Sequence, residues 1–154
     1  PLGFPMSPLD LLGLVGPGVA LHVAQTLHDN LGGRYNVSPT ISRLVSSGVK
    51  TFYLKDADGK LTPDPAAVAL IEKGNSPSTA EEVRNRALKA IAQEAKMMLD
   101  EGVVATPAEI DLCMLLGAGW PMHLGGILPY LDREGVSLSA CGSRFHPAGL
   151  ASLG

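Results

Sequence analysis

The chain has 154 residues, of which 45% are hydrophobic, and its formal net charge is −3. This length fits one domain or two small packed units with a core of ordinary size. The small charge, with no cluster of Lys and Arg, argues against nucleic acid and anionic membrane surfaces as partners. Two cysteines are too few for a disulfide scaffold, and we expect a cytoplasmic protein without a signal peptide or a membrane span.

Residues 7–48 predict three helices. Ser7 and Ser38 are each followed by proline, which is typical of a helix that begins with a hydroxyl N-cap. The first helix should end at Gly16-Pro17-Gly18, and the third at Gly48. The second has apolar residues on one face, spaced three or four apart: Leu21, Ala24, Leu27 and Leu31.

The next segment changes from helical to strand-like composition. Residues 51–54 are rich in aromatic and β-branched side chains, and residues 56–59 supply turn residues. We therefore expect a small β-hairpin near 51–62. A short helix over 66–73 should follow, and residues 74–78 form the best candidate for a linker.

The longest predicted helix begins after this linker. Both Ser78 with Glu81 and Thr79 with Glu82 match the spacing of a capping box. Its apolar row should be Val83, Ala87, Ile91, Ala95 and Met98. A second capping box over 106–109 should open another helix, and a last helix should cover about 124–133. The residues after 135 carry few signals of order.

A three-residue step occurs twice in the chain. Phe4-Pro5-Met6 and Trp120-Pro121-Met122 both lead into apolar, helix-like stretches, which indicates a duplicated helical unit. We therefore predict a mostly α-helical fold with two tandem units. Residues 1–74 form the first helical repeat with the hairpin, residues 75–135 the second, and residues 136–154 a C-terminal tail. Because the first copy starts at its aromatic step, we expect its opening long helix to precede residue 1.

No group of residues predicts a self-contained active site. Gly13, Gly16 and Gly18 follow no strand, and Pro17 removes an amide donor, so a helix-breaking turn is favoured over a dinucleotide loop. The four histidines lack the spacing of metal ligands. Cys113 is interpreted as an inert core thiol. The same interpretation, as core filling, applies to Met97, Met98, Met114 and Met122.

Asp111 lies early in the helix that begins near residue 107. A carboxylate near a helix N-terminus is favoured by the helix dipole, and we prefer this role to contact with a substrate. The sequence leaves the roles of Asp111 and His123 open.

Four stretches carry a resemblance to a known family. They are residues 3–16 (GFPMSP…LLGLVG), 48–60 (GVKTFY…GK), 100–111 (DEGVVATPAEID) and 119–132 (GWP…GG…YLD). In this order they resemble the motifs of the C-terminal domain of NAD-dependent 3-hydroxyacyl-CoA dehydrogenases, in the duplicated form of the multifunctional fatty-acid-oxidation chains. Ser7, Met122-His123 and Leu124 depart from the family pattern.

The resemblance implies a part of a 3-hydroxyacyl-CoA dehydrogenase that is inactive alone. The NAD-binding Rossmann domain, the catalytic His-Glu pair and an enoyl-CoA hydratase domain would lie outside these residues, so this fragment would bind no cofactor and no metal. Pro5, Met6 and Leu9 would line the acyl side of the acyl-CoA cleft, with Tyr53 a weaker candidate. The implied partners are the acyl-CoA substrate, the chain's own Rossmann and hydratase domains, and a thiolase chain.

Alternatives stay open at this point. Pro5-Met6 could serve only to end one helix and begin another. The region could be an assembly module for dimerisation or docking that touches no substrate, or an independent acyl-ligand-binding protein. Because the first repeat lacks its long helix, Leu21 and Leu27 should also expose an apolar patch, and we expect self-association through it.

Overall fold

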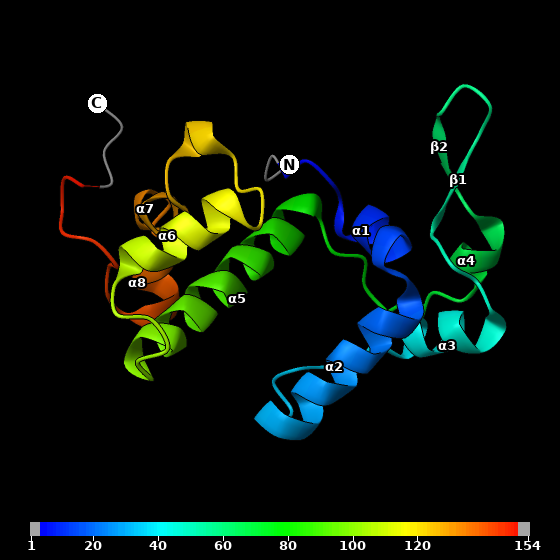
Figure 1. Ribbon diagram of the computed structural model, residues 1–154, viewed down its shortest axis with the longest axis horizontal. Coiled ribbons are helices and arrows are strands. Elements are labelled where there is room, and N and C mark those ends of the chain that lie inside the picture. The colour runs from blue at the N-terminus through cyan, green and yellow to red at the C-terminus, as the bar shows by residue number, and fades with distance from the viewer. Residues whose placement is uncertain (1–3, 151–154) are drawn as a thin grey trace. The chain divides into compact units, whose positions relative to one another are not determined.

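The structure is a computed structural model that describes residues 4–150, and helices dominate it (Figure 1). The predicted mostly α-helical fold with a small β-hairpin is confirmed. The chain divides into two compact units. Unit 1 contains Phe4, Pro5 and residues 77–150, and unit 2 contains residues 6–76. Gly3, which opens the first motif of the resemblance, and residues 151–154 of the predicted tail lie outside the described residues.

Unit 2 consists of four helices and one strand pair. In chain order they are α1 (Pro8–Val15), α2 (Pro17–Leu31), α3 (Pro39–Ser47), β1 (Tyr53–Lys55), β2 (Leu61–Pro63) and α4 (Pro65–Ala69). The strands pair antiparallel, with Leu54 opposite Thr62. Helix α4 is shorter than the predicted helix over 66–73. The chain beyond it turns to α3, where the Glu72 amide donates to Thr40 Oγ1 and the Arg43 guanidinium donates to the Leu70 carbonyl.

The first helix begins as its sequence predicts. Ser7 Oγ accepts a hydrogen bond from the Asp10 amide, and the Asp10 carboxylate accepts one from the Ser7 amide, which completes a capping box. The helix ends at Gly16, whose φ of 93° suits glycine. Pro17 then begins α2, so a single residue separates the two helices.

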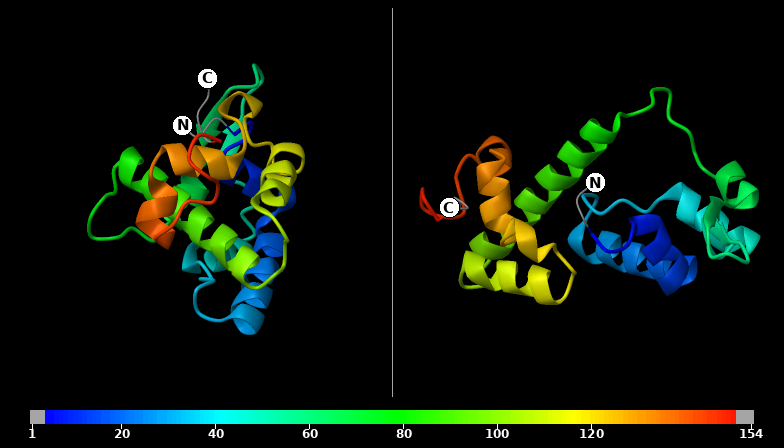
Figure 2. Two further views of the ribbon diagram at one scale, coloured as in Figure 1. Left: turned by 90° about the vertical axis from the view of Figure 1, so that its left-hand side faces the viewer. Right: turned by 90° about the horizontal axis from the view of Figure 1, so that it is seen from above.

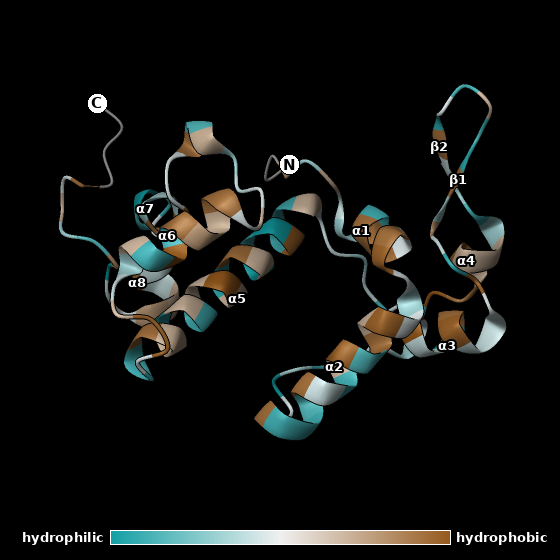
Figure 3. Cartoon of the chain, viewed as in Figure 1, coloured by the Kyte–Doolittle hydropathy of each residue, from teal (hydrophilic) through white to brown (hydrophobic). Residues whose placement is uncertain are grey.

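The core of unit 2 is small. Its buried apolar residues are Leu44, Phe52 and Ala67, and the side chains packed on them are Leu12, Val49, Tyr53 and Leu70. Apolar residues recur along α1 and α2 (Figure 3). Several of their side chains are exposed. Leu21 and Leu27, which were expected to be exposed, are half-buried. The exposed large apolar residues of α2 are instead Val19, Val23 and Leu31.

Unit 1 contains a long helix and several short ones. They are α5 (Ala80–Asp100), α6 (Pro107–Leu116), the 3₁₀ turn η1 (Met122–Leu124), α7 (Ile127–Arg133) and α8 (Val136–Cys141). Helix α8 packs along α5, and α7 packs against α6 and α8 (Figure 2). The predicted helix over 124–133 is divided at Gly125, whose φ is 74°. The predicted tail contains α8, so its residues 136–150 are an ordered part of unit 1.

The two predicted capping boxes of unit 1 have different outcomes. Thr79 and Glu82 form theirs at the start of α5, with both reciprocal hydrogen bonds present. The box at α6 does not form, because Thr106 makes no side-chain cap. Glu109 instead accepts a hydrogen bond from the amide of Ala105, one residue outside the expected cap.

The core of unit 1 is larger and surrounds Trp120. Its buried residues are Leu88, Ala92, Ala95, Ile110, Trp120, Ile127, Leu128 and Leu131. The buried stripe of α5 thus passes through Leu88 and Ala92 rather than through Val83, which is 48% exposed. Cys113 is exposed and Met122 is 72% exposed, so the interpretation of both as core residues is wrong.

Within residues 4–150, no single helix has both the length and the apolar character that a membrane crossing requires. Helices α1 and α2 reach that length and composition only when taken together, and the chain bends by 103° between them.

Candidate functional site

Three of the four predicted substrate-binding residues lie in unit 2. Met6 directly precedes the capped start of α1, and Leu9 lies in its first turn. Their side chains are 42% and 39% exposed. Tyr53 opens β1 and is half-buried against the small core.

Helix α1 and strand β1 lie close together. A Cβ atom placed on Gly13 would be 2.8 Å from Thr51 Oγ1, so a side chain at residue 13 would collide with Thr51. The same hydroxyl accepts a hydrogen bond from the Tyr53 amide at 3.2 Å and donates one to the Tyr53 carbonyl at 3.2 Å. Leu12 and Tyr53 also pack on one cluster. The structure therefore brings Tyr53 next to the helix that carries Leu9.

Pro5 is placed differently, because it packs within unit 1. Its ring carbon would be 3.2 Å from a Cβ atom on Gly119. The neighbouring Phe4 ring meets Trp120 edge to face, with centroids 5.6 Å apart. The two copies of the repeated aromatic-proline step therefore lie side by side. The sequence showed that the step recurs but not that its copies pack on each other.

A polar cluster that the sequence did not predict lies in unit 1. We call it the carboxylate cluster; its members are Asp111, Asp132, Ser137 and His146. Asp111 Oδ1 accepts a hydrogen bond of 2.8 Å from the Leu128 amide in the first turn of α7. Asp111 Oδ2 lies 3.1 Å from His146 Nε2. Both side chains are mostly buried, at 13% and 14% exposed.

Asp132 holds the other side of the cluster. Its carboxylate accepts hydrogen bonds from the amides of Phe145 and His146, at 3.0 and 2.9 Å, and from the Ser137 hydroxyl. The residue is only 3% exposed, and its buried oxygens are satisfied by these donors. The cluster therefore joins α6, α7, α8 and the segment that follows α8.

The expected role of Asp111 needs a correction. It was expected to stabilise the N-terminus of its own helix, α6, but its carboxylate caps α7. Gly126 makes this possible, because a Cβ atom there would lie 2.5 Å from Asp111 Cγ. Burial raises the pKa of Asp111, while the Leu128 amide and His146 oppose the increase. The glycine pair at 125–126 was the available signal in the sequence for so close an approach.

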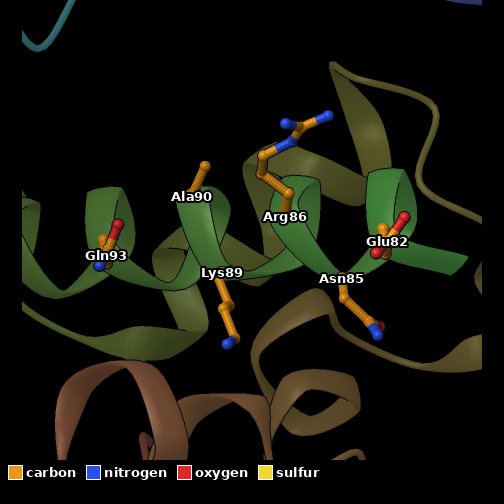
Figure 4. A pocket seen from close by; sticks show the side chains of 6 residues that line it. All are labelled: Glu82, Asn85, Arg86, Lys89, Ala90 and Gln93. Carbon is orange, nitrogen blue, oxygen red and sulfur yellow. The ribbon is translucent and has the colours of Figure 1, made fainter. Parts of the chain in front are cut away.

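Other polar groups of unit 1 do not converge on a ligand. A hollow of about 490 Å³ runs along α5 and is lined by Glu82, Asn85, Arg86, Lys89, Ala90 and Gln93. In Figure 4, Arg86 and Ala90 point to one side of the helix, whereas Asn85 and Lys89 point to the other. Among residues 4–150, no three His, Cys, Asp or Glu side chains come together as metal ligands.

Comparison with known proteins identifies related sequences. A family model described as the 3-hydroxyacyl-CoA dehydrogenase C-terminal domain matches residues 1–54 and 83–143. The chain is 30% identical to the fatty acid oxidation complex subunit alpha of Shewanella putrefaciens, over 94% of this chain and 23% of that protein. The corresponding protein of Shewanella amazonensis is 31% identical, over 96% of this chain and 24% of its own length.

A plant protein is similar to the same extent. The peroxisomal fatty acid beta-oxidation multifunctional protein AIM1 of Arabidopsis thaliana is 30% identical, over 86% of this chain and 21% of that protein. The chain thus spans about a quarter of the length of the curated relatives it matches.

Proposed function

Because the chain belongs to the family of 3-hydroxyacyl-CoA dehydrogenase C-terminal domains, we propose that it works within an NAD-dependent dehydrogenase of fatty-acid β-oxidation. In this proposal the whole protein oxidises a 3-hydroxyacyl-CoA and also carries an enoyl-CoA hydratase domain. This chain supplies a wall of the acyl-CoA cleft and contacts between domains or subunits. It has no dehydrogenase activity on its own. The cytoplasmic location expected from its two thiols stays a prediction.

The glycines at 13, 16 and 18 do not form a dinucleotide loop in the structure. Gly13 lies inside α1, and Gly16 joins α1 to α2 with Pro17 as the first residue of α2. A dinucleotide loop requires a strand before its glycines and amides that point at the pyrophosphate. We therefore assign NAD and the catalytic His-Glu pair to other domains of the whole protein.

The exposure of Met6 and Leu9 is the observation that supports a cleft wall. The capping box of Ser7 and Asp10 fixes the backbone between these two residues, so the positions from which both side chains project are set before a ligand arrives. An acyl chain packed on them would gain about 0.8 kcal/mol for each methylene group that it buries. Tyr53 and Pro5 remain proposed members of this wall.

Substitution in the whole protein tests this assignment. Met6→Ala with Leu9→Ala should raise KM for long-chain 3-hydroxyacyl-CoA several-fold and change kcat little, since both side chains would contribute binding and not chemistry. Leu14→Ala is the matched control, because Leu14 lies on the same helix and is 72% exposed. Normal kinetics together with altered assembly would instead support the alternative, a docking module that contacts no substrate.

We also propose that the chain self-associates through α2. Val19, Val23, Leu27 and Leu31 are four residues apart in succession and form what we call the α2 ridge. Leu27 is half-buried, whereas the other three are about half exposed. The chain's own Rossmann and hydratase domains and a thiolase chain are further proposed partners in the whole protein.

A further inference from the structure

Helix α1 meets the start of strand β1 at a glycine. A Cβ atom on Gly13 would lie 2.8 Å from Thr51 Oγ1 and 3.4 Å from Thr51 Cβ, with the Thr51 Cα at 3.9 Å. Gly13 lies within α1 and, unlike Gly16, does not have a positive φ, so the helix backbone itself does not require glycine there. Glycine is also less favourable than alanine inside a helix. The close approach of Thr51 is therefore the feature that favours glycine at this residue.

Thr51 is not free to turn away from α1. Its hydroxyl accepts a hydrogen bond from the Tyr53 amide and donates one to the Tyr53 carbonyl, both at 3.2 Å. Between them, Phe52 is 6% exposed in the small core, and its carbonyl accepts from the Asp64 amide at 2.8 Å. The hydroxyl that meets Gly13 thus also holds the backbone of Tyr53, in a segment that is anchored on both sides.

The contact also determines where Leu9 lies relative to Tyr53. Leu9 precedes Gly13 by four residues, so the two lie on one face of α1, a single turn apart. Leu12 packs with Tyr53 on the small core of unit 2. Any movement of α1 away from Thr51 therefore also moves Leu9 away from Tyr53.

We propose that the contact of Gly13 with Thr51 sets the preference of the acyl-CoA cleft for long acyl chains, which rests on the cleft wall proposed above. Both are positioning residues, which keep Leu9 and Tyr53 at a fixed spacing and do not touch the substrate themselves. An apolar wall gains binding free energy with each methylene group that it covers. A long acyl chain offers many such groups and a short one few, so the spacing of the wall matters mainly for long chains.

Substitution of Gly13 in the whole protein tests this role. Gly13→Ala should raise KM for a long-chain 3-hydroxyacyl-CoA about fivefold, the equivalent of roughly one methylene contact. KM for a short-chain substrate and kcat for both should change little. Gly18→Ala is the matched control, because Gly18 lies in α2 with open space around it.

A second substitution shows whether the collision with Thr51 is the cause. Thr51→Ala removes the hydroxyl that Gly13→Ala would strike, so the double variant should raise KM by less than the two single effects combined. Amide hydrogen exchange of the 154-residue chain gives a measurement independent of activity. In Gly13→Ala the Tyr53 amide should exchange several-fold faster, whereas the amide of the buried Leu44 should keep its protection.

The outcomes separate this role from the wall itself. An unchanged KM in Met6→Ala with Leu9→Ala, at every chain length, contradicts the wall and this role together. If that pair raises KM but Gly13→Ala leaves the chain-length preference unchanged, or if its effect adds fully to that of Thr51→Ala, only the positioning role is overturned. Should Gly13→Ala fail to fold, Thr51→Val carries the test, because it keeps the volume, loses both hydrogen bonds to Tyr53 and should raise KM for long chains alone.

Discussion

At the scale of single residues, Asp111 approaches Gly126 more closely than any neighbour approaches the other described glycines of unit 1. The carboxylate is fixed by the Leu128 amide on one side and by His146 on the other, so it has little freedom to move away. A methyl group at residue 126 would approach it to 2.5 Å. The absence of a side chain at this residue is what lets α6 and α7 share the cluster.

Substitution of Gly126 tests this constraint. Gly126→Ala should lower the free energy of unfolding by about 1–3 kcal/mol, the usual cost of overpacking, as measured by urea denaturation. Gly18→Ala is the control, because Gly18 lies in α2 with open space around it and should be neutral or stabilising by up to about 1 kcal/mol. Equal effects of the two substitutions would contradict the close approach.

Asp111 should also leave a signature in the pH dependence of stability. Burial raises its pKa above the ordinary value of 3.8, so the folded chain keeps this proton to a higher pH than the unfolded chain does. The free energy of unfolding therefore decreases as the pH rises from 3.8 through the folded pKa. Asp111→Asn removes this decrease, and the difference between the two unfolding curves should change across that interval. A difference that is constant with pH would show that burial does not control this group.

The contacts and burial of single residues could be predicted from the sequence only in part. The position of Asp111 near a helix start was visible, but its partner helix begins at residue 127, and nothing in the spacing specifies that contact. Cys113 and Met122 were assigned to the core from their apolar character. Whether such a residue faces the core depends on which neighbour covers its helix, and this is decided by tertiary packing.

At the scale of elements, the start of α5 shows which of two equally good predicted capping boxes forms. Ser78 with Glu81 and Thr79 with Glu82 have the same spacing, yet the structure uses Thr79. Hydrogen bonds from the Thr79 amide and hydroxyl lower the pKa of Glu82, since they stabilise the ionised carboxylate. Because Thr79 is the N-cap, the longest helix begins at Ala80.

A pair of alanine substitutions distinguishes these caps. Thr79→Ala should destabilise the chain by about 1 kcal/mol, because an amide of the first turn loses its acceptor. Ser78→Ala, one residue earlier, should change the free energy of unfolding by less than about 0.5 kcal/mol, as is usual for a surface substitution. Thermal unfolding followed by circular dichroism measures both, and a larger effect at Ser78 would contradict the assigned cap.

Elements with strong local signals were predicted well. The proline-led starts of α1 and α3 and the hairpin of β1 and β2 depend on neighbouring residues, and each forms where expected. The apolar row predicted for α5 is confirmed at Ala95, which is buried, and at Ile91 and Met98, which pack on the core. Val83 is exposed instead, and the buried Leu88 and Ala92 were not predicted. Helix α8 was missed because it is short and depends on packing against α5.

At the scale of the whole molecule, the α2 ridge should determine the state of association. Exchange of Val19 and Val23 for Gln removes apolar surface that a second copy would cover, so sedimentation velocity should show a shift towards monomer. Val103→Gln with Leu150→Gln is the control, because these residues are 64% and 69% exposed and lie in unit 1. A strictly monomeric unaltered chain at high concentration would contradict self-association.

The family itself could be predicted from the sequence, because its motifs are local and occur in order. The match over residues 1–54 and 83–143 includes both copies of the aromatic-proline step. The contact between Phe4 and Trp120 could not be predicted, since it joins residues more than a hundred positions apart. The membership of a substrate-binding wall likewise depends on surfaces that the spacing of residues does not specify.

We propose that this chain is a helical part of a 3-hydroxyacyl-CoA dehydrogenase and that the catalytic residues lie in other domains. The most direct test of this proposal is a spectrophotometric assay of the purified 154-residue chain for NADH formation from a 3-hydroxyacyl-CoA and NAD. Circular dichroism should confirm that the chain is folded, and a full-length relative serves as the positive control. We expect no NADH above background from the folded chain. NADH formation in proportion to its concentration would contradict the assignment of the catalytic residues to other domains.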